Sequence, residues 1–242
     1  MYRAFLSHCC TRLSLAVLLV QSLSITAKAG EPNAKEMMIC AHEARANWDD
    51  FPGFTADIVV STNSAVIKGQ MWVAADGKLK LGLPKSPKTA WARRRLKSMI
   101  DHRLPRSDRK FDVSFADDIK THPLGRLIRF NQDRLHSVYR IKGDVITEVH
   151  RTTGLTRFTI SVSQVSRNAE GKILPKSYSV SWWDAKTGNL KACDTVYNEW
   201  VRVGRLDLPA KLLVVRTEDD GKRQVGQVVF RNHQLLSTAV DK

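Results

Sequence analysis

From Gly125 onward, short segments rich in β-branched and aromatic residues alternate with turn residues, and this pattern restricts the fold more than any other feature of the chain. One segment carries Phe158, Ile160 and Val162 in alternation with threonine and serine, which is typical of a strand with one buried and one wet face. The predicted strands are Arg126–Asn131, Leu135–Ile141, Val145–Arg151, Thr156–Val165, Tyr178–Trp183, Leu190–Val203, Lys211–Thr217 and Val225–Phe230. Because the connections between them are short, neighbouring strands should run antiparallel in a meander.

The first half of the chain adds two helices and three strands to this prediction. A helix is expected over Asn33–Trp48, where Asn33 and Glu36 have the spacing of a capping box. A second helix should begin at Ser86-Pro87 and end near His102. Between the helices, the predicted strands are Phe54–Thr62, Val66–Val73 and Lys78–Leu83, joined by turns at Asn63-Ser64 and Asp76-Gly77. The sequence therefore indicates a mostly β (α+β) protein with two main helices and a single domain over residues 30–242.

The first 29 residues have the three parts of a secretory signal peptide. Arg3 and Arg12 give a basic start, Leu13–Leu23 is an apolar run, and Ala27-Lys28-Ala29 supplies the small residues of a cleavage site. The apolar run is shorter than the ~20 residues of a membrane-spanning helix, so a retained anchor is the weaker interpretation. We expect cleavage after Ala29 and an exported bacterial protein, periplasmic or extracellular.

The chain is strongly basic, with a formal net charge of +15 at pH 7. Such a charge favours anionic partners, for example lipid head groups, anionic polymers or acidic proteins, although it can serve solubility alone. Because we expect export, nucleic acid is not an expected partner. The sequence does not indicate an oligomeric state.

Two cysteines, Cys40 and Cys193, follow the predicted signal peptide. In an oxidising compartment an even number of cysteines permits a disulfide, and we expect one between Cys40 and Cys193. The alternative is a pair of buried free thiols, because free cysteine is among the most buried residue types.

Most motifs that carry chemistry are missing from the sequence. It has no G-x-S-x-G, G-x-G-x-x-G, P-loop or C-x-x-C, and no cofactor or metal is expected. Residues 102–126 are rich in histidine, aspartate and arginine, and His102, Asp112 and His122 are candidate acid–base residues of a hydrolase or transferase. The alternative is an exposed connection stabilised by ordinary ion pairs, because the spacing matches no known site.

Aromatic and basic residues supply the candidate binding positions. Arg93 and Arg94, beside Trp91 on the second predicted helix, are suited to an anionic surface, including peripheral contact with a membrane, or form an ordinary solvated helix face. Trp182 and Trp183 are adjacent on a predicted strand and so should point to opposite faces of the sheet. One of these indoles then belongs to the core and the other must line a helix, a groove or a ligand.

Three stretches of the sequence together resemble a bacterial family of unknown function, DUF3386. They are Trp48–Asp57, His122–Arg126, and Val180–Asp184 followed by Thr187-Gly188. The resemblance covers most of the mature chain and implies no activity and no site residues. At a coarser level, Phe54–Asp57, Lys68–Trp72 and Asp76–Leu79 stand in an order similar to that of the periplasmic lipoprotein-carrier (LolA/LolB-like) fold. That resemblance implies a curved antiparallel sheet or half-barrel around helices, with an apolar groove for acyl chains.

These observations favour a binding protein over an enzyme. We expect a curved sheet that holds an apolar or amphiphilic ligand, a lipid or lipoprotein acyl chain, in a groove. Trp72, Trp182 and Trp183 are the candidate lining residues, and Arg93 and Arg94 are candidates for an anionic head group. The alternatives are the enzyme centred on residues 102–126 and a structural envelope protein without a small ligand.

Overall fold

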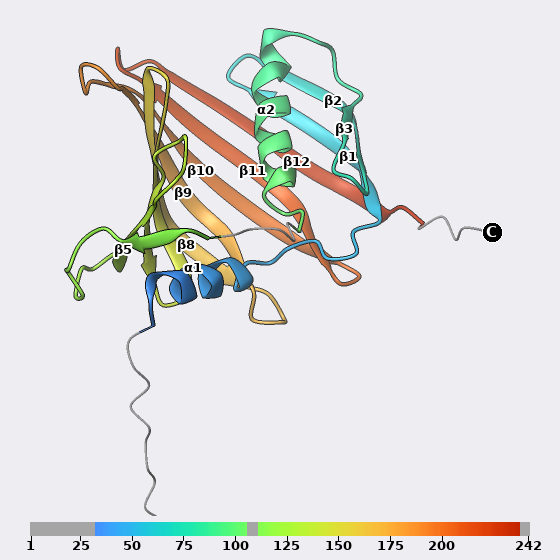
Figure 1. Ribbon diagram of the computed structural model, residues 1–242. Coiled ribbons are helices and arrows are strands. Elements are labelled where there is room, and N and C mark those ends of the chain that lie inside the picture. Colours follow the sequence, from blue (N-terminus) through green and yellow to red (C-terminus); the bar gives the residue numbers. More distant parts are fainter. Residues whose placement is uncertain (1–31, 106–110, 238–242) are drawn as a thin grey trace, which may run out of the picture. The chain divides into compact units, whose positions relative to one another are not determined.

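The computed structural model describes residues 32–105 and 111–237, which form one twelve-stranded sheet and two helices (Figure 1). The helices are α1 (Ala34–Glu43) and α2 (Pro87–Asp101). The strands are β1 (Gly53–Thr62), β2 (Ala65–Ala74), β3 (Leu79–Leu81), β4 (Val113–Phe115), β5 (Arg126–Phe130), β6 (Val138–Lys142), β7 (Val145–Thr153), β8 (Thr156–Arg167), β9 (Ile173–Asp184), β10 (Leu190–Val203), β11 (Leu206–Glu218) and β12 (Arg223–Leu235).

The sheet is antiparallel and consists of two meanders, β1–β3 and β4–β12, which are joined where the first strand, β1, pairs with the last, β12. Its strand order is β3-β2-β1-β12-β11-β10-β9-β8-β7-β6-β5-β4. Every neighbour is adjacent in sequence except β1 and β12, which pair antiparallel with Val60 opposite Val228. The predicted fold class, a mostly antiparallel β protein with two helices, is therefore confirmed. The sheet is open, because β3 and β4 stand at its two edges.

Both helices begin where their capping residues predict. Asn33 and Glu36 form the expected capping box of α1, and Ser86 with Pro87 begins α2, which ends next to His102 as predicted. Helix α1 ends at Glu43 and is shorter than the predicted Asn33–Trp48. The residues that follow leave the helix because their backbone groups bond to other elements, with Ala46 donating to the Ile173 carbonyl across 2.9 Å.

The two helices cover the same face of the sheet over different strands. Helix α2 packs Ala92, Leu96 and Ile100 into a large buried cluster with apolar residues of β1, β2, β10, β11 and β12. Helix α1 packs Met38 and Ala41 against Ile128 of β5 and the β6 residues Tyr139 and Ile141. Figure 1 shows α2 over the strands that include β11 and β12, and α1 beside another part of the sheet. The pairing register carries one face continuously across β6 to β10, so a stretch of that face lies between the helices.

Candidate ligand-binding face

An apolar strip occupies the face of the sheet between the two helices. On β8, Phe158, Ile160 and Val162 point to this face and are only half-buried. Their register partners on the same face are Val149 of β7 opposite Ile160, and Trp182 and Tyr178 of β9 opposite Phe158 and Val162. We call these six residues the apolar strip. The three β8 residues belong to neither buried cluster, so the helices leave them without full cover.

The opposite face of the same strands is polar. Thr159 and Ser161 alternate with the apolar residues of β8, and their neighbours across β7 and β9 are His150 and Ser179. The Thr159 hydroxyl lies 3.1 Å from Nδ1 of His150. The sheet is thus amphipathic at β8: the polar face is suited to contact with water, whereas the apolar strip lies on the face that sheets of this kind normally bury.

A buried carboxylate borders the apolar strip. Asp194 of β10 is fully buried and accepts a 2.9 Å hydrogen bond from Nε1 of Trp182. It also forms ion pairs with Arg216 of β11, at 3.1 Å, and with Arg95 of α2. Because Arg216 also pairs with Glu218 at 2.6 Å, the charges within this group balance. The group attaches α2 to the strands beside the strip.

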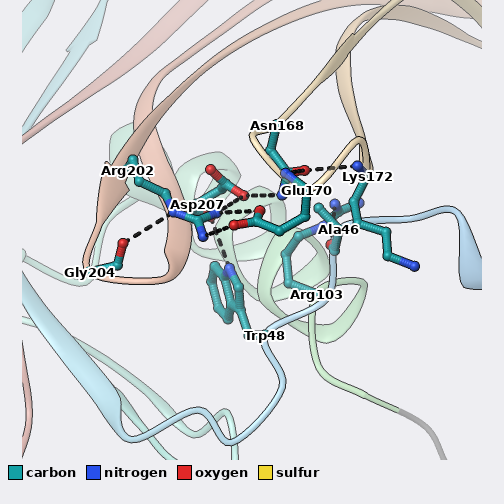
Figure 2. Close-up of polar contacts among 9 residues, drawn as sticks. All are labelled: Ala46, Trp48, Arg103, Asn168, Glu170, Lys172, Arg202, Gly204 and Asp207. Atoms are coloured by element: carbon teal, nitrogen blue, oxygen red, sulfur yellow. Dashed lines mark hydrogen bonds and ion pairs between the residues drawn. The ribbon is translucent and has the colours of Figure 1, made fainter.

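A polar network closes the end of this face where the chain passes from α1 to β1 (Figure 2). Asp207 accepts hydrogen bonds from Asn168, at 2.7 Å, and from Arg202, at 3.0 Å, and its backbone carbonyl accepts one from Nε1 of Trp48 at 2.9 Å. The Trp48 amide donates to the carbonyl of Arg103 across 2.7 Å. The β8–β9 and β10–β11 hairpins and the segments that follow the two helices, all far apart in sequence, are therefore held together here.

Arg103 stands at this end of the face with its side chain inside the protein. It is 4% exposed, and its Nη1 donates to the Ala46 carbonyl across 2.8 Å. Its guanidinium carbon lies 5.4 Å from the centroid of the Trp200 ring. Burial, and next the nearby Arg45, lower the pKa of Arg103 to about 9, so the side chain is still a cation at neutral pH.

The comparisons with known proteins identify a family. The family model of proteins of unknown function DUF3386 matches residues 29–236. The chain belongs to this family. The predicted resemblance to DUF3386 is thereby confirmed. Among proteins with curated descriptions, none matches the chain.

Two solved structures are similar to this DUF3386 protein over most of their length. One is a LolA superfamily protein from Nitrosomonas europaea, with 9% identity, 86% of this chain and 95% of that chain covered, and a TM-score of 0.38. The other is a putative outer membrane lipoprotein-sorting protein domain from Vibrio parahaemolyticus, with 9% identity, 87% and 94% covered, and a TM-score of 0.39. At these scores the similarity carries no argument about what the DUF3386 protein binds.

The structure places the three predicted tryptophans differently. Trp182 and Trp183 point to opposite faces, as alternation predicts: Trp182 lies in the apolar strip, and Trp183 lies under Arg157, 5.6 Å from its guanidinium. Trp72 was expected to line the same groove, and this is corrected. Its neighbours Met71 and Val73 are buried under α2, so Trp72 points to the other face of the sheet. There it is 39% exposed and borders a separate hollow of about 470 Å³.

Arg93 and Arg94 do not reach the apolar strip. They lie on the outer side of α2, where with Lys97 and His102 they line a shallow hollow of about 520 Å³. Arg93 is half-buried and donates to the Leu83 carbonyl across 2.8 Å, whereas Arg94 is exposed. Arg151 of β7 is the arginine that stands opposite Phe158 of the strip, and Arg95 of α2 reaches the border of the strip through its ion pair with Asp194. Arg151 could have been found from the alternation of β7, because it stands two positions after Val149 and so shares its face.

The candidate catalytic residues are not brought together. His102 follows the end of α2, where its Nδ1 lies 2.7 Å from the Ser98 carbonyl oxygen. Asp112 accepts from Asn131 beyond one end of β5, at 2.8 Å, whereas His122 lies before the other end of β5. Within the described residues, no group of three or more histidine, cysteine, aspartate or glutamate side chains could hold a metal ion. The enzyme alternative thus has no cluster of acid–base groups at these positions.

The expected disulfide is corrected as well, because Cys40 and Cys193 are both free thiols. The Ala44 carbonyl, one turn after Cys40, bonds to the first residue of β9, Ile173. Cys193 instead pairs with Ser181, about eight residues farther along β9, or roughly 26 Å at 3.3 Å per residue. A disulfide requires Cα atoms less than about 7 Å apart.

The predicted signal peptide, residues 1–29, lies outside the described residues. In the ranges 32–105 and 111–237, neither helix has the length and apolar character needed to cross a membrane.

Proposed function

We propose that this DUF3386 protein binds an apolar or amphiphilic ligand, a lipid or a lipoprotein acyl chain, on the apolar strip. One observation carries the proposal: Phe158, Ile160 and Val162 lie side by side, half-buried, on the face that both helices cover elsewhere. A contiguous and partly exposed apolar surface is a mark of a binding site in a soluble protein.

The free energy available on such a surface is sufficient for useful affinity. Each buried methylene contributes about 0.8 kcal/mol, so an acyl chain of about ten carbons supplies roughly 8 kcal/mol before ordering costs. Micromolar affinity corresponds to about 8 kcal/mol. Since ordering costs reduce the gain, the residues of the strip on both sides of β8 must also contribute contacts. Val149 of β7 and Trp182 of β9 flank β8 and are suited to do so.

We further propose that the ligand is met outside the cytoplasm. The signal-like segment of residues 1–29 supports export, to the periplasm or beyond it, and the net charge of +15 supports approach to anionic lipid surfaces. Arg94 and Lys97 on the exposed side of α2 are the residues proposed for peripheral membrane contact.

The test is a titration of the mature protein with a long-chain fatty acid or with anionic phospholipid, followed by tryptophan emission. We expect a change in emission with micromolar or tighter affinity, because Trp182 borders the strip. Ile160→Asn should weaken binding at least tenfold by placing an amide on the apolar strip. Thr159→Asn is the matched control, since it introduces the same side chain on the polar face.

Native mass spectrometry of protein purified from its own host adds a second measurement, in which bound lipid would be visible directly. The absence of binding in the titration, together with the absence of any co-purified lipid, would show that the carrier proposal is wrong. The structural alternative would then replace it.

A further inference from the structure

Among the described residues, Arg103 is the most buried arginine and forms no ion pair, whereas the half-buried Arg151, which also lacks a carboxylate partner, donates to the hydroxyls of Ser137 and Tyr139. Arg95, Arg202 and Arg216 are each more exposed, and each forms an ion pair with a carboxylate. In the part of the chain that the structure describes, the Arg103 guanidinium contacts only the Ala46 carbonyl and the Trp200 ring. Asp207 offsets part of the cost of burying this cation, but burial is the larger effect and the pKa of Arg103 remains lowered.

The bond to Ala46 leaves one edge of the guanidinium unused. Nη1 is the atom that donates to the carbonyl, so Nε and Nη2 remain as a pair of parallel donors. Such an edge matches the two oxygens of a carboxylate in a bidentate arrangement. The lowered pKa of Arg103, which has burial as its main cause, agrees with a site where a negative charge would be favourable.

Tyr178 is the residue of the apolar strip at this end. It pairs with Val162 of β8 on one side and with Val196 of β10 on the other. Burial raises the pKa of its hydroxyl, and the positive charges of Arg95 and Arg103 act against that rise, so the hydroxyl lies in the field of Arg103. Among residues 32–105 and 111–237, no side chain or backbone group forms a hydrogen bond with it.

Asn198 is a third polar side chain at this end of the strip, and one of its hydrogen-bonding positions is not filled. Asn198 of β10 is 6% exposed and stands two positions after Val196, the neighbour of Tyr178. Its amide nitrogen donates to the Pro175 carbonyl at 3.2 Å, but its buried Oδ1 has no hydrogen-bond partner within the described chain. The apolar strip therefore ends in polar groups whose bonding capacity is not filled.

We infer that Arg103 and Tyr178 bind the carboxylate head group of a fatty acid whose chain lies along the apolar strip toward Phe158 and Trp182. This inference rests on the proposed function and adds the chemistry and the direction of the ligand. We choose a carboxylate because its two oxygens match the parallel Nε and Nη2 donors of the Arg103 guanidinium.

The test compares laurate with 1-dodecanol, which has the same chain without the charge, on the mature protein and its variants. The wild-type protein should bind laurate at least tenfold more tightly than 1-dodecanol. Arg103→Met should abolish most of this preference while leaving 1-dodecanol within about twofold of wild type, because methionine keeps an apolar stem. Arg231→Met is the matched control, since Arg231 is exposed and alternates with the buried Phe230, so that it lies on the other face of the sheet, and both affinities should be unchanged.

Tyr178→Phe gives a second variant that removes a single oxygen and keeps the ring, should Arg103→Met fail to fold. It should lower laurate affinity severalfold and leave 1-dodecanol unaffected. Equal affinity of the wild-type protein for the two ligands, or an equal loss of both in Arg103→Met, would overturn the inference while the proposed function stands. Tighter binding of dodecyl phosphate than of laurate would overturn the choice of carboxylate. If neither laurate nor 1-dodecanol binds, the proposed function fails and the inference falls with it.

Discussion

Trp182 donates its indole N–H to the Asp194 carboxylate across 2.9 Å, which joins a side chain of the apolar strip to a fully buried charge. The same carboxylate holds Arg95 of α2 and Arg216 of β11. One aspartate therefore positions the edge of the candidate site and one of the two helices. Its loss should affect the stability of the whole protein.

Asp194→Asn should lower the free energy of unfolding by about 2 kcal/mol, because it weakens the hydrogen bonds that the buried carboxylate accepts from Trp182, Arg95 and Arg216. Urea denaturation followed by circular dichroism would measure the change. Glu199→Gln is the control on the same strand, since Glu199 forms an exposed 3.2 Å pair with Lys211 and should matter by less than about 1 kcal/mol. Equal losses in the two variants would contradict the role given to Asp194.

Gly125, in the turn before β5, should be the glycine that tolerates substitution least. Its φ is +89°, and a Cβ at this position would stand 2.0 Å from the Ile141 carbonyl oxygen. Gly125→Ala should therefore cost about 3 kcal/mol or more, from the left-handed backbone and the clash with neighbouring backbone together. Gly143→Ala is the comparison: its φ is +61°, open space surrounds it, and about 1 kcal/mol is expected. Thermal unfolding of the two variants would separate the clash from the backbone effect.

Acid should destabilise the protein below about pH 4. The Lys191 side chain, together with the amides of Thr187 and Lys186, holds the pKa of Asp184 far below its usual range, and Arg167 lowers the pKa of Asp144. A lowered folded-state pKa stabilises the fold above the unfolded value of about 3.9, and this stabilisation is lost as the pH falls through the folded pKa.

The double variant Asp144→Asn/Asp184→Asn should therefore lose less stability between pH 5 and pH 2 than the wild-type protein does. Urea midpoints measured across that range would show it. Parallel pH curves for the two proteins would contradict the assignment.

Cys40 and Cys193 should both react with an alkylating reagent without prior reduction. Cys40 is exposed and should react first, whereas Cys193 is half-buried beside the Ser181 hydroxyl and should react more slowly. Mass spectrometry of protein lacking residues 1–29 should show two adducts. An unmodified protein that becomes reactive only after reduction would restore the disulfide that the sequence led us to expect.

Features that depend on neighbours along the chain were predictable from the sequence. The alternation of apolar and polar residues predicts that Trp182 and Trp183 point to opposite faces, because successive side chains of a strand always do. Asn33 and Ser86 mark the beginnings of the helices, since capping involves residues only three positions apart. Strand β4, Val113–Phe115, escaped prediction, whereas the equally short β3 was predicted because the Asp76-Gly77 turn precedes it.

What covers each face was decided only by the tertiary structure. Nothing local distinguishes Trp72 from Trp182, yet α2 covers the residues beside Trp72 and leaves Trp72 on the far face. Asp194 and Arg103 look in the sequence like ordinary surface charges, and both are buried. Arg95 meets Asp194 across 99 positions of the chain. Alternation assigns residues to a face, but burial and charge pairing depend on which distant element packs there, and no pattern of adjacent residues contains that information.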